Sequence, residues 1–164
     1  MMSEGSLAWQ FMSDTQRQLA LDGQLLIEDR KRHPNEQLSD YSYLVFPFAK
    51  LYEGFLKALL WNLGIITERE HLSSHFRLGK VLSPNLIRRL KDHSAYAQIS
   101  SRFGEDLAIE LWDTWKQGRN LVFHYFPHNV RRLSIVDAQA TIDLITRAME
   151  HAADRMRPSI HGRK

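Results

Sequence analysis

Residues 44–63 of this chain of 164 residues have the sequence LVFPFAKLYEGFLKALLWNL, and the fold can be predicted outward from this apolar segment. Its apolar side chains cover nearly every face of the helix that their spacing predicts, and only Lys50, Glu53 and Lys57 interrupt them. A helix that is apolar nearly all round is typical of the centre of a bundle. The three charged residues also make the stretch a poor membrane span.

The residues that flank this stretch set the limits of the predicted helix. Ser39 or Asp40 can cap its N-terminus, and Gly64 can stop it. Pro47 predicts a kink near its start. We therefore expect a helix from about residue 40 to residue 63.

Outward from this helix, the chain keeps helical periodicity, and no stretch alternates convincingly with a period of two. Helices are expected over residues 7–32, 83–91, 104–117 and 134–157, with a short helix in a connection over 67–82. Pro34 and its neighbours end the first of these helices. Ser134 with Asp137 resembles a capping box at the start of the last. The prediction is an all-α fold, an antiparallel bundle of four to five main helices.

Length and composition indicate a single helical domain over residues 1–158 and a flexible polar tail over 159–164. The chain has no cysteine, which excludes disulfides, cysteine–zinc sites and thiol chemistry. A net charge of +3 is compatible with a polyanionic partner without requiring one. Basic clusters at 30–32, 88–91, 131–132 and in the tail are equally typical of solvated helix faces.

The N-terminus indicates a cytoplasmic protein. Glu4 stands where a signal peptide carries positive charge, and no apolar core follows it. No membrane association is expected.

The sequence RNLVFH at residues 119–124 contains the residue types that carry chemistry on phosphates. Arg119 and His124 would lie about 140° apart on an ideal helix. They share one cleft only if the helix bends or a second copy of the chain supplies the opposite wall. Gly118 and Pro127 bracket the motif, and these are the residue types most able to bend it.

This motif resembles the signature of the HEPN superfamily, in which an arginine precedes a histidine by four to six intervening residues. A polar residue often follows that arginine, and here it is Asn120. The helical context and the position of the motif before a long final helix strengthen the resemblance. It implies an endoribonuclease that forms a 2′,3′-cyclic phosphate and a 5′-hydroxyl.

A second resemblance concerns residues 40–54, which look like the HEPN domain of the RNase LS toxins of bacterial toxin–antitoxin systems. An Asp and a Glu on this helix join the active site in that family. The matching positions are Asp40 and Glu53. The resemblance covers roughly residues 36–155 and implies a homodimeric toxin with a protein antitoxin.

The chemistry fits these residue types without a metal or cofactor, because RNA carries its own 2′-OH nucleophile. His124 would move protons near neutral pH. Arg119 would bind the phosphate oxygens and stay charged throughout. Glu53 would orient one of the two, and Asn120 would support them. Asp40 would play a lesser part in the site or serve only as a helix cap.

Glu53 and the histidines also have simpler interpretations, as a surface ion pair and as metal ligands. Glu53 could pair with Lys57 at i,i+4, although a carboxylate on so apolar a helix makes Arg119 an attractive partner. The spacing of His71 and His75, repeated at His124 and His128, suits zinc ligands, but no third ligand is evident.

Control of the protein by adenylylation of a tyrosine is not favoured by the sequence. HEPN toxins that are paired with nucleotidyltransferase antitoxins often have that tyrosine two residues after the histidine, where this chain has Phe126, and the tyrosine here is Tyr125. An inhibitor that binds and occludes is therefore expected. The alternatives to the ribonuclease are a non-catalytic HEPN module that binds RNA or nucleotide, and a helical dimerisation or regulatory protein.

Overall fold

The computed structural model describes residues 2–33 and 37–158, and all regular secondary structure within these ranges is helical. The long helices are α2 (Asp14–Arg32), α3 (Ser42–Asn62), α8 (Glu105–Trp115) and α9 (Ile135–Met156). The short helices are α1 (Leu7–Phe11), α4 (Glu68–Leu72), α5 (Leu78–Val81), α6 (Ile87–Leu90) and α7 (Ala95–Phe103). The prediction of an all-α bundle is confirmed. Pro34 and the predicted tail 159–164 lie outside the described residues.

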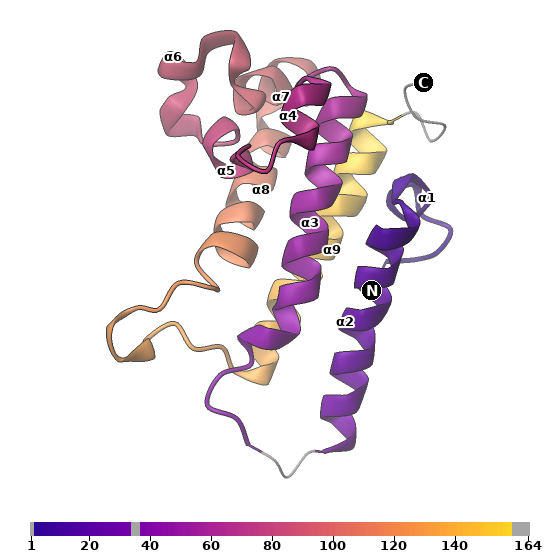
Figure 1. The fold of residues 1–164 in the computed structure, drawn as a ribbon, viewed down its shortest axis with the longest axis vertical. Coiled ribbons are helices and arrows are strands. Elements are labelled where there is room, and N and C mark those ends of the chain that lie inside the picture. Colours follow the sequence, from indigo (N-terminus) through magenta and orange to yellow (C-terminus); the bar gives the residue numbers. More distant parts are fainter. Residues whose placement is uncertain (1, 34–36, 159–164) are drawn as a thin grey trace.

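Successive long helices run in opposite directions, as Figure 1 shows. α2 descends in that view, α3 rises beside it, α8 descends on the other side, and α9 rises behind α3. The short helices α4 to α7 gather at the end of the bundle where α3 finishes. This leaves the opposite end, where α8 gives way to a loop that leads to α9, open to the surroundings.

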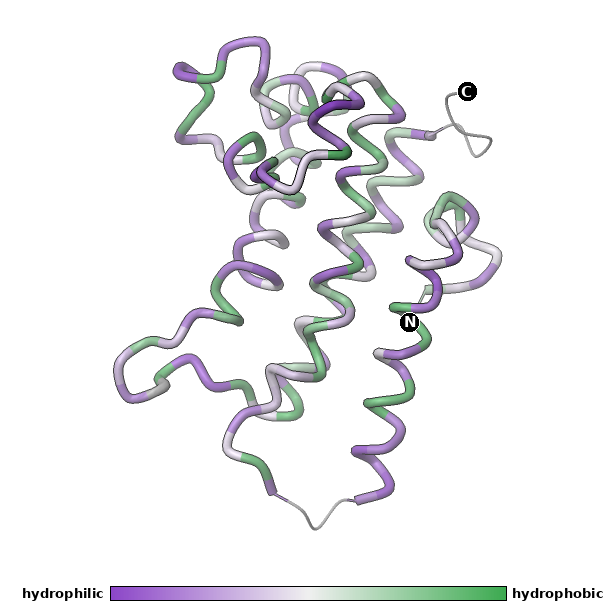
Figure 2. The backbone as a smooth tube through the Cα atoms, viewed as in Figure 1, coloured by the Kyte–Doolittle hydropathy of each residue, from purple (hydrophilic) through white to green (hydrophobic). Residues whose placement is uncertain are grey.

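α3 is the central helix because its apolar residues reach the neighbouring helices on several sides. Hydrophobic residues follow it along most of its length in Figure 2, whereas α2 alternates between hydrophobic and hydrophilic. Phe55, Leu56, Leu59 and Leu60 are fully buried. Each such side chain stabilises the fold by about 1.5–3 kcal/mol. The packing therefore explains why the apolar segment 44–63 lies at the centre of the bundle, as predicted.

Tyr52 fixes the contact of α3 with α8. Its buried hydroxyl donates a hydrogen bond of 2.9 Å to the carbonyl oxygen of Leu111. Burial raises the pKa of Tyr52 well above its ordinary value, so the group remains a neutral donor. A buried hydroxyl group needs a hydrogen-bond partner. The bond to Leu111 therefore fixes the position of α8 along the length of α3.

The prediction of one helix over residues 7–32 is wrong. The chain breaks at Met12, and α2 begins after Ser13. Ser13 accepts a hydrogen bond from the backbone N–H of Gln16, whose side chain accepts one from the N–H of Ser13 in return. This capping box was not recognised because apolar periodicity continues across it.

The region between α3 and α8 also differs from the prediction. The expected helix over 83–91 is a series of short turns: η1 (Pro84–Leu86), α6 and η2 (Lys91–His93). α7 occupies a stretch to which no element was assigned, and Ser94 caps it. Gly104, with φ of 108°, then separates α7 from α8. A left-handed φ of this kind is why glycine stands there.

The start of the last helix agrees with its prediction. Ser134 and Asp137 form the expected capping box at the N-terminus of α9. Within α3 the helix continues through Pro47, which lies near its start as expected, and the kink itself stays a prediction. None of the helices in the described ranges combines the length and the apolar character needed to cross a membrane.

Candidate functional site

The arginine of the motif lies in a π-helical turn, η3 (Lys116–Asn120), which continues directly from α8. The backbone N–H of Leu121 donates to the carbonyl oxygen of Lys116, five residues earlier, at 2.9 Å. π-turns are rare and frequently lie at functional sites. The helix ends at this turn, so Arg119 and His124 do not share one regular helix.

Gly118 allows this turn to lie close to α9. A Cβ atom added to Gly118 would stand only 2.8 Å from the Cγ1 atom of Ile145. Such an approach is closer than carbon atoms tolerate, so a side chain here would displace either the Ile145 side chain or the turn itself. Packing against α9 therefore fixes the position from which Arg119 projects.

Arg119 forms an ion pair with Glu53 of α3. Its Nε–H donates to the Oε2 atom of Glu53 at 2.9 Å, and the side chains are 41% and 33% exposed respectively. Exposed ion pairs of this kind stabilise a fold by less than about 1 kcal/mol. Stability is thus a weak explanation for a charged pair placed on the most apolar helix of the bundle.

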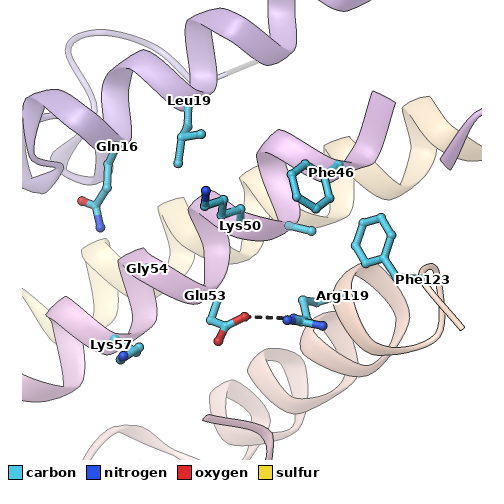
Figure 3. Close-up of a pocket in the computed structure, with 10 residues that line it drawn as sticks. Gln16, Leu19, Phe46, Lys50, Glu53, Gly54, Lys57, Arg119 and Phe123 are labelled. Carbon is cyan, nitrogen blue, oxygen red and sulfur yellow. Dashed lines mark hydrogen bonds and ion pairs between the residues drawn. The ribbon is translucent and has the colours of Figure 1, made fainter. Parts of the chain in front are cut away.

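The pair lies in a groove between α2, α3 and the end of α8, with a volume of about 550 Å³. Figure 3 shows Lys50 and Lys57 of α3 on either side of Glu53 along the helix, with Gln16 across from them on α2. We call this space the Arg119 groove. It combines three cationic side chains with one carboxylate, which suits an anionic ligand.

Two aromatic rings border one end of the Arg119 groove. Phe46 and Phe123 meet edge to face with their centroids 5.6 Å apart, and both are substantially exposed. The sequence analysis did not assign these residues, Gln16 or Lys50 to the site. A signal was present for Lys50, because residues three and four apart on a helix share a face with Glu53.

The alternative pairing of Glu53 with Lys57 is not the contact that Glu53 makes. The ammonium group of Lys57 instead donates to the carbonyl oxygen of Ser73 at 3.4 Å and lies 5.7 Å from the centre of the Phe76 ring. The carboxylate of Glu53 therefore pairs with Arg119 and not with Lys57.

His124 lies beyond the end of the helix, in the turn that follows it, and is exposed. Its Nε2 atom is 3.2 Å from the Oδ1 atom of Asn120, and this hydrogen bond orients the ring. The side-chain partner of His124 is thus Asn120, while Arg119 pairs with Glu53. The structure therefore joins the predicted residues in two pairs rather than in one cluster.

Asp40 is held by the backbone at the start of α3. Its Oδ1 atom accepts hydrogen bonds from the N–H of Ser42 at 2.9 Å, from the Ser42 hydroxyl at 2.5 Å and from the N–H of Leu133 at 3.2 Å. Beside it, the N–H of Tyr41 donates to the carbonyl oxygen of Leu133. Asp40 ties the start of α3 to the chain before α9 and does not line the Arg119 groove.

The two histidine pairs with zinc-like spacing do not lie on single helices. His71 stacks on Trp61, with centroids 4.7 Å apart, and α4 ends before His75. His128 has a positive φ of 61° in the loop after His124. In the described part of the chain, no three or more histidine or acidic side chains are grouped as a metal ion would need.

Two of the basic clusters are partly engaged in the fold. Arg30 is buried, and its guanidinium lies 5.4 Å from the centre of the Tyr41 ring. Arg155 pairs with Asp106 at 2.9 Å and holds the pKa of that carboxyl below its ordinary value. These two arginines contact other elements of the bundle, which neither of the two predicted roles, a polyanion contact or a solvated helix face, describes.

Searches against protein-family models, curated proteins and solved structures found no match for this chain.

Proposed function

We propose that this protein is a metal-independent endoribonuclease of the HEPN type, with Arg119, His124 and Glu53 as its working residues. The observation that carries the proposal is the ion pair between Arg119 and Glu53 at the wall of an open, cationic groove. The pair contributes little to stability, and a phosphate offers the guanidinium further oxygen acceptors in the same groove.

The reaction is a transesterification within RNA. A proton leaves the 2′-OH, the 2′-oxygen attacks the adjacent phosphorus, and the bond from phosphorus to the 5′-oxygen breaks. The products are a 2′,3′-cyclic phosphate and a 5′-hydroxyl, which receives a proton. His124 is the group suited to these proton transfers, and Arg119 stabilises the charge that develops on the phosphate oxygens. Glu53 holds the guanidinium in place.

A second copy of the chain brings His124 to the phosphate in this proposal. His124 is exposed, contacts Asn120 and is not among the residues that line the Arg119 groove. Phe123, Tyr125 and Val130 expose apolar surface around it, with Tyr125 80% exposed. A twofold axis through this end of the bundle would bring the histidine of one copy toward the groove of the other.

The biological setting that we propose is a cytoplasmic toxin or phage-defence nuclease held in check by a protein inhibitor. Phe126 stands where HEPN toxins that are paired with nucleotidyltransferase antitoxins often have the modified tyrosine, and its ring lies 4.6 Å from the guanidinium carbon of Arg131. It offers no hydroxyl for adenylylation. An inhibitor that covers the Arg119 groove or the surface around Tyr125 is therefore the expected form of control.

An RNA cleavage assay tests the proposal. Purified protein in excess EDTA should cleave an unstructured RNA, and the products should carry 2′,3′-cyclic phosphate ends. His124→Ala should lose activity by about 10²–10⁴-fold with an unchanged circular dichroism spectrum. Activity of the variant close to that of the wild type would contradict the proposal.

The dimer is tested separately. Light scattering should give twice the chain mass of 19.2 kDa. A mixture of inactive Arg119→Ala and inactive His124→Ala chains should recover activity if each site takes its residues from two copies. A monomer that cleaves RNA would contradict the shared site while leaving the ribonuclease itself standing.

A second candidate function is a non-catalytic module that binds RNA. The separation of His124 from the Arg119 groove within one chain favours it. Such a module would bind RNA with strong salt dependence and leave it intact in the same assay.

A further inference from the structure

A second groove lies on the other side of Lys57 from the Arg119 groove. It has a volume of about 540 Å³ and is formed by α4, the segment that follows α4, and part of η2. Its lining residues are Thr67, Arg69, Glu70, Ser73, His75, Phe76 and His93. None of these residues was assigned a role with RNA by the sequence or by the proposed chemistry. We call this space the His93 groove.

Lys57 joins the two grooves. Its side chain lines the Arg119 groove, and its ammonium group contacts Ser73 and Phe76, which line the His93 groove. From Glu53 to Lys57, α3 rises only about 6 Å. A chain molecule bound at the Glu53–Arg119 pair can therefore continue past Lys57 into the His93 groove.

The His93 groove presents donors and positive charge. Arg69, His75 and His93 are all exposed, and Arg69 has no ion-pair partner among the residues that the structure describes. Each imidazole offers at least one N–H donor in either protonation state. The single acidic residue of the lining, Glu70, accepts hydrogen bonds from the N–H and the hydroxyl of Thr67, both at 2.8 Å. With the ammonium group of Lys57 at Ser73 and Phe76, the groove has two fixed cations, Lys57 and Arg69, against the one carboxylate of Glu70, and this balance favours an anion.

The groove also offers an aromatic ring. Phe76 is partly exposed and lies with Lys57 near one of its faces. A cationic groove with an aromatic side chain is the combination by which proteins bind single-stranded nucleic acid, where bases stack and cations follow the phosphates. An inorganic anion has no base that could stack on the ring, so Phe76 favours a nucleic acid as the ligand.

We propose that the His93 groove binds the single-stranded RNA that flanks the scissile phosphate, with Arg69 and His93 on the backbone and Phe76 beneath a base. This inference rests on the proposed function and names its substrate class: an unpaired strand that extends at least one nucleotide beyond the two nucleotides joined by the scissile phosphate. A base in a duplex is stacked on both sides and cannot lie on Phe76.

The first test compares two substrates. In the double variant Arg69→Ala/His93→Ala, kcat/KM for a long unstructured oligouridylate should fall about tenfold, while kcat/KM for a uridine dinucleotide should stay unchanged. The matched control is Arg88→Ala/Arg89→Ala, which removes two exposed arginines of α6 that line neither groove. Equal effects on both substrates, or an equal loss in the control, would overturn the proposal.

The second test measures binding without cleavage. Fluorescence anisotropy with a 2′-O-methyl oligouridylate, which lacks the nucleophile, should show weaker binding and a shallower salt dependence for Arg69→Ala/His93→Ala than for the wild type. Phe76→Ala should weaken binding by about tenfold, as the loss of one stacked base does. If both variants bound the strand as tightly as the wild type does, the proposed role of the His93 groove would be overturned.

Failure of the proposed function gives a different result. The wild-type protein could bind the 2′-O-methyl strand through Arg69 and Phe76 and yet cleave neither RNA substrate. That result would support the proposed groove and contradict the proposed nuclease. Cleavage that is indifferent to these variants would retain the nuclease and reject the groove.

Discussion

Asp40 and Glu53 are both acidic, and both were predicted to belong to one site. Asp40 lies just before α3 and Glu53 near its middle, and the surroundings of the two carboxylates differ. Asp40 accepts three hydrogen bonds from Ser42 and Leu133, two of them from backbone N–H groups. Glu53 lies about 16 Å further along the helix from Ser42 and contacts a side chain, the guanidinium of Arg119. The first carboxylate is enclosed by the fold, and the second borders an open groove.

This difference separates structure from chemistry on one helix. A carboxylate held by backbone donors cannot give up those partners without disturbing the elements that they belong to. A carboxylate that holds a flexible guanidinium can exchange part of that contact for a ligand. We therefore expect Asp40 to affect stability and Glu53 to affect catalysis, and four variants test this division.

The largest effect is expected from Arg119→Ala. Removing the cation that stabilises the phosphate should lower the cleavage rate by about 10²–10³-fold, as loss of a single oxyanion donor does in other enzymes. The melting temperature should change little, because the exposed pair with Glu53 contributes less than about 1 kcal/mol. Measured cleavage rates and thermal melts of the same preparation check both statements. A large fall in melting temperature with no loss of rate would reverse the comparison.

Glu53→Gln should have a smaller effect on catalysis. The amide keeps the shape of the side chain but loses the charge that orients Arg119, and we expect the cleavage rate to fall about tenfold, which corresponds to the loss of roughly one charge-assisted hydrogen bond. Its melting curve should match that of the wild type. Glu105→Gln is the control, because it makes the same charge change at an exposed position that lines neither groove; a fall as large as that of Glu53→Gln would argue for a general charge effect.

Asp40→Ala should act in the opposite sense. The backbone N–H groups of Ser42 and Leu133 lose their acceptor, which should destabilise the protein by about 1–3 kcal/mol. The cleavage rate of the folded fraction should equal that of the wild type. Urea unfolding gives the first quantity, and cleavage at low temperature gives the second. Loss of cleavage without loss of stability would return Asp40 to the site.

The smallest effect concerns a third carboxylate, Asp137, in the capping box of α9. Hydrogen bonds from the hydroxyl and the N–H of Ser134 lower its pKa. It therefore contributes stability above the ordinary pKa of an aspartate, about 3.9, and loses it as pH falls through the lowered value. Asp137→Asn keeps the acceptor oxygen but cannot titrate, so its stability should fall less steeply with acid than that of the wild type. Parallel pH profiles would assign this stabilisation to other groups.

Local signals explain which parts of the fold could be predicted from the sequence. The apolar run of α3 and the Ser134–Asp137 box of α9 depend on residues close together in the chain, and both predictions are confirmed. The break after α1 has an equally local signal in Ser13 and Gln16, which apolar periodicity masked. α7 spans only nine residues, and it was missed although Ser94 caps its start and Ala95, Tyr96 and Ile99 form one buried face.

The candidate site was predictable only in part. The partnership of Glu53 with Arg119 was expected, because a carboxylate on an apolar helix needs a cation, and the structure contains it. Whether Asp40 belonged to the site could not be decided, since its partner Leu133 is distant in sequence. The π-turn was not predicted either, because it depends on how closely Gly118 approaches α9.

The π-turn at Lys116–Asn120 makes the site sensitive to chain length as well as to residue identity. Its hydrogen-bonded ring contains one residue more than an α-helical turn, so deletion of the exposed Gln117 would let the helix close in its ordinary form. Leu121 would then donate to Lys116 as the fourth residue after it and keep its place, whereas Gly118 and Arg119, inside the shortened turn, would shift around the helix axis. One codon lost or gained here would move Arg119 off Glu53 without changing a single side chain of the site.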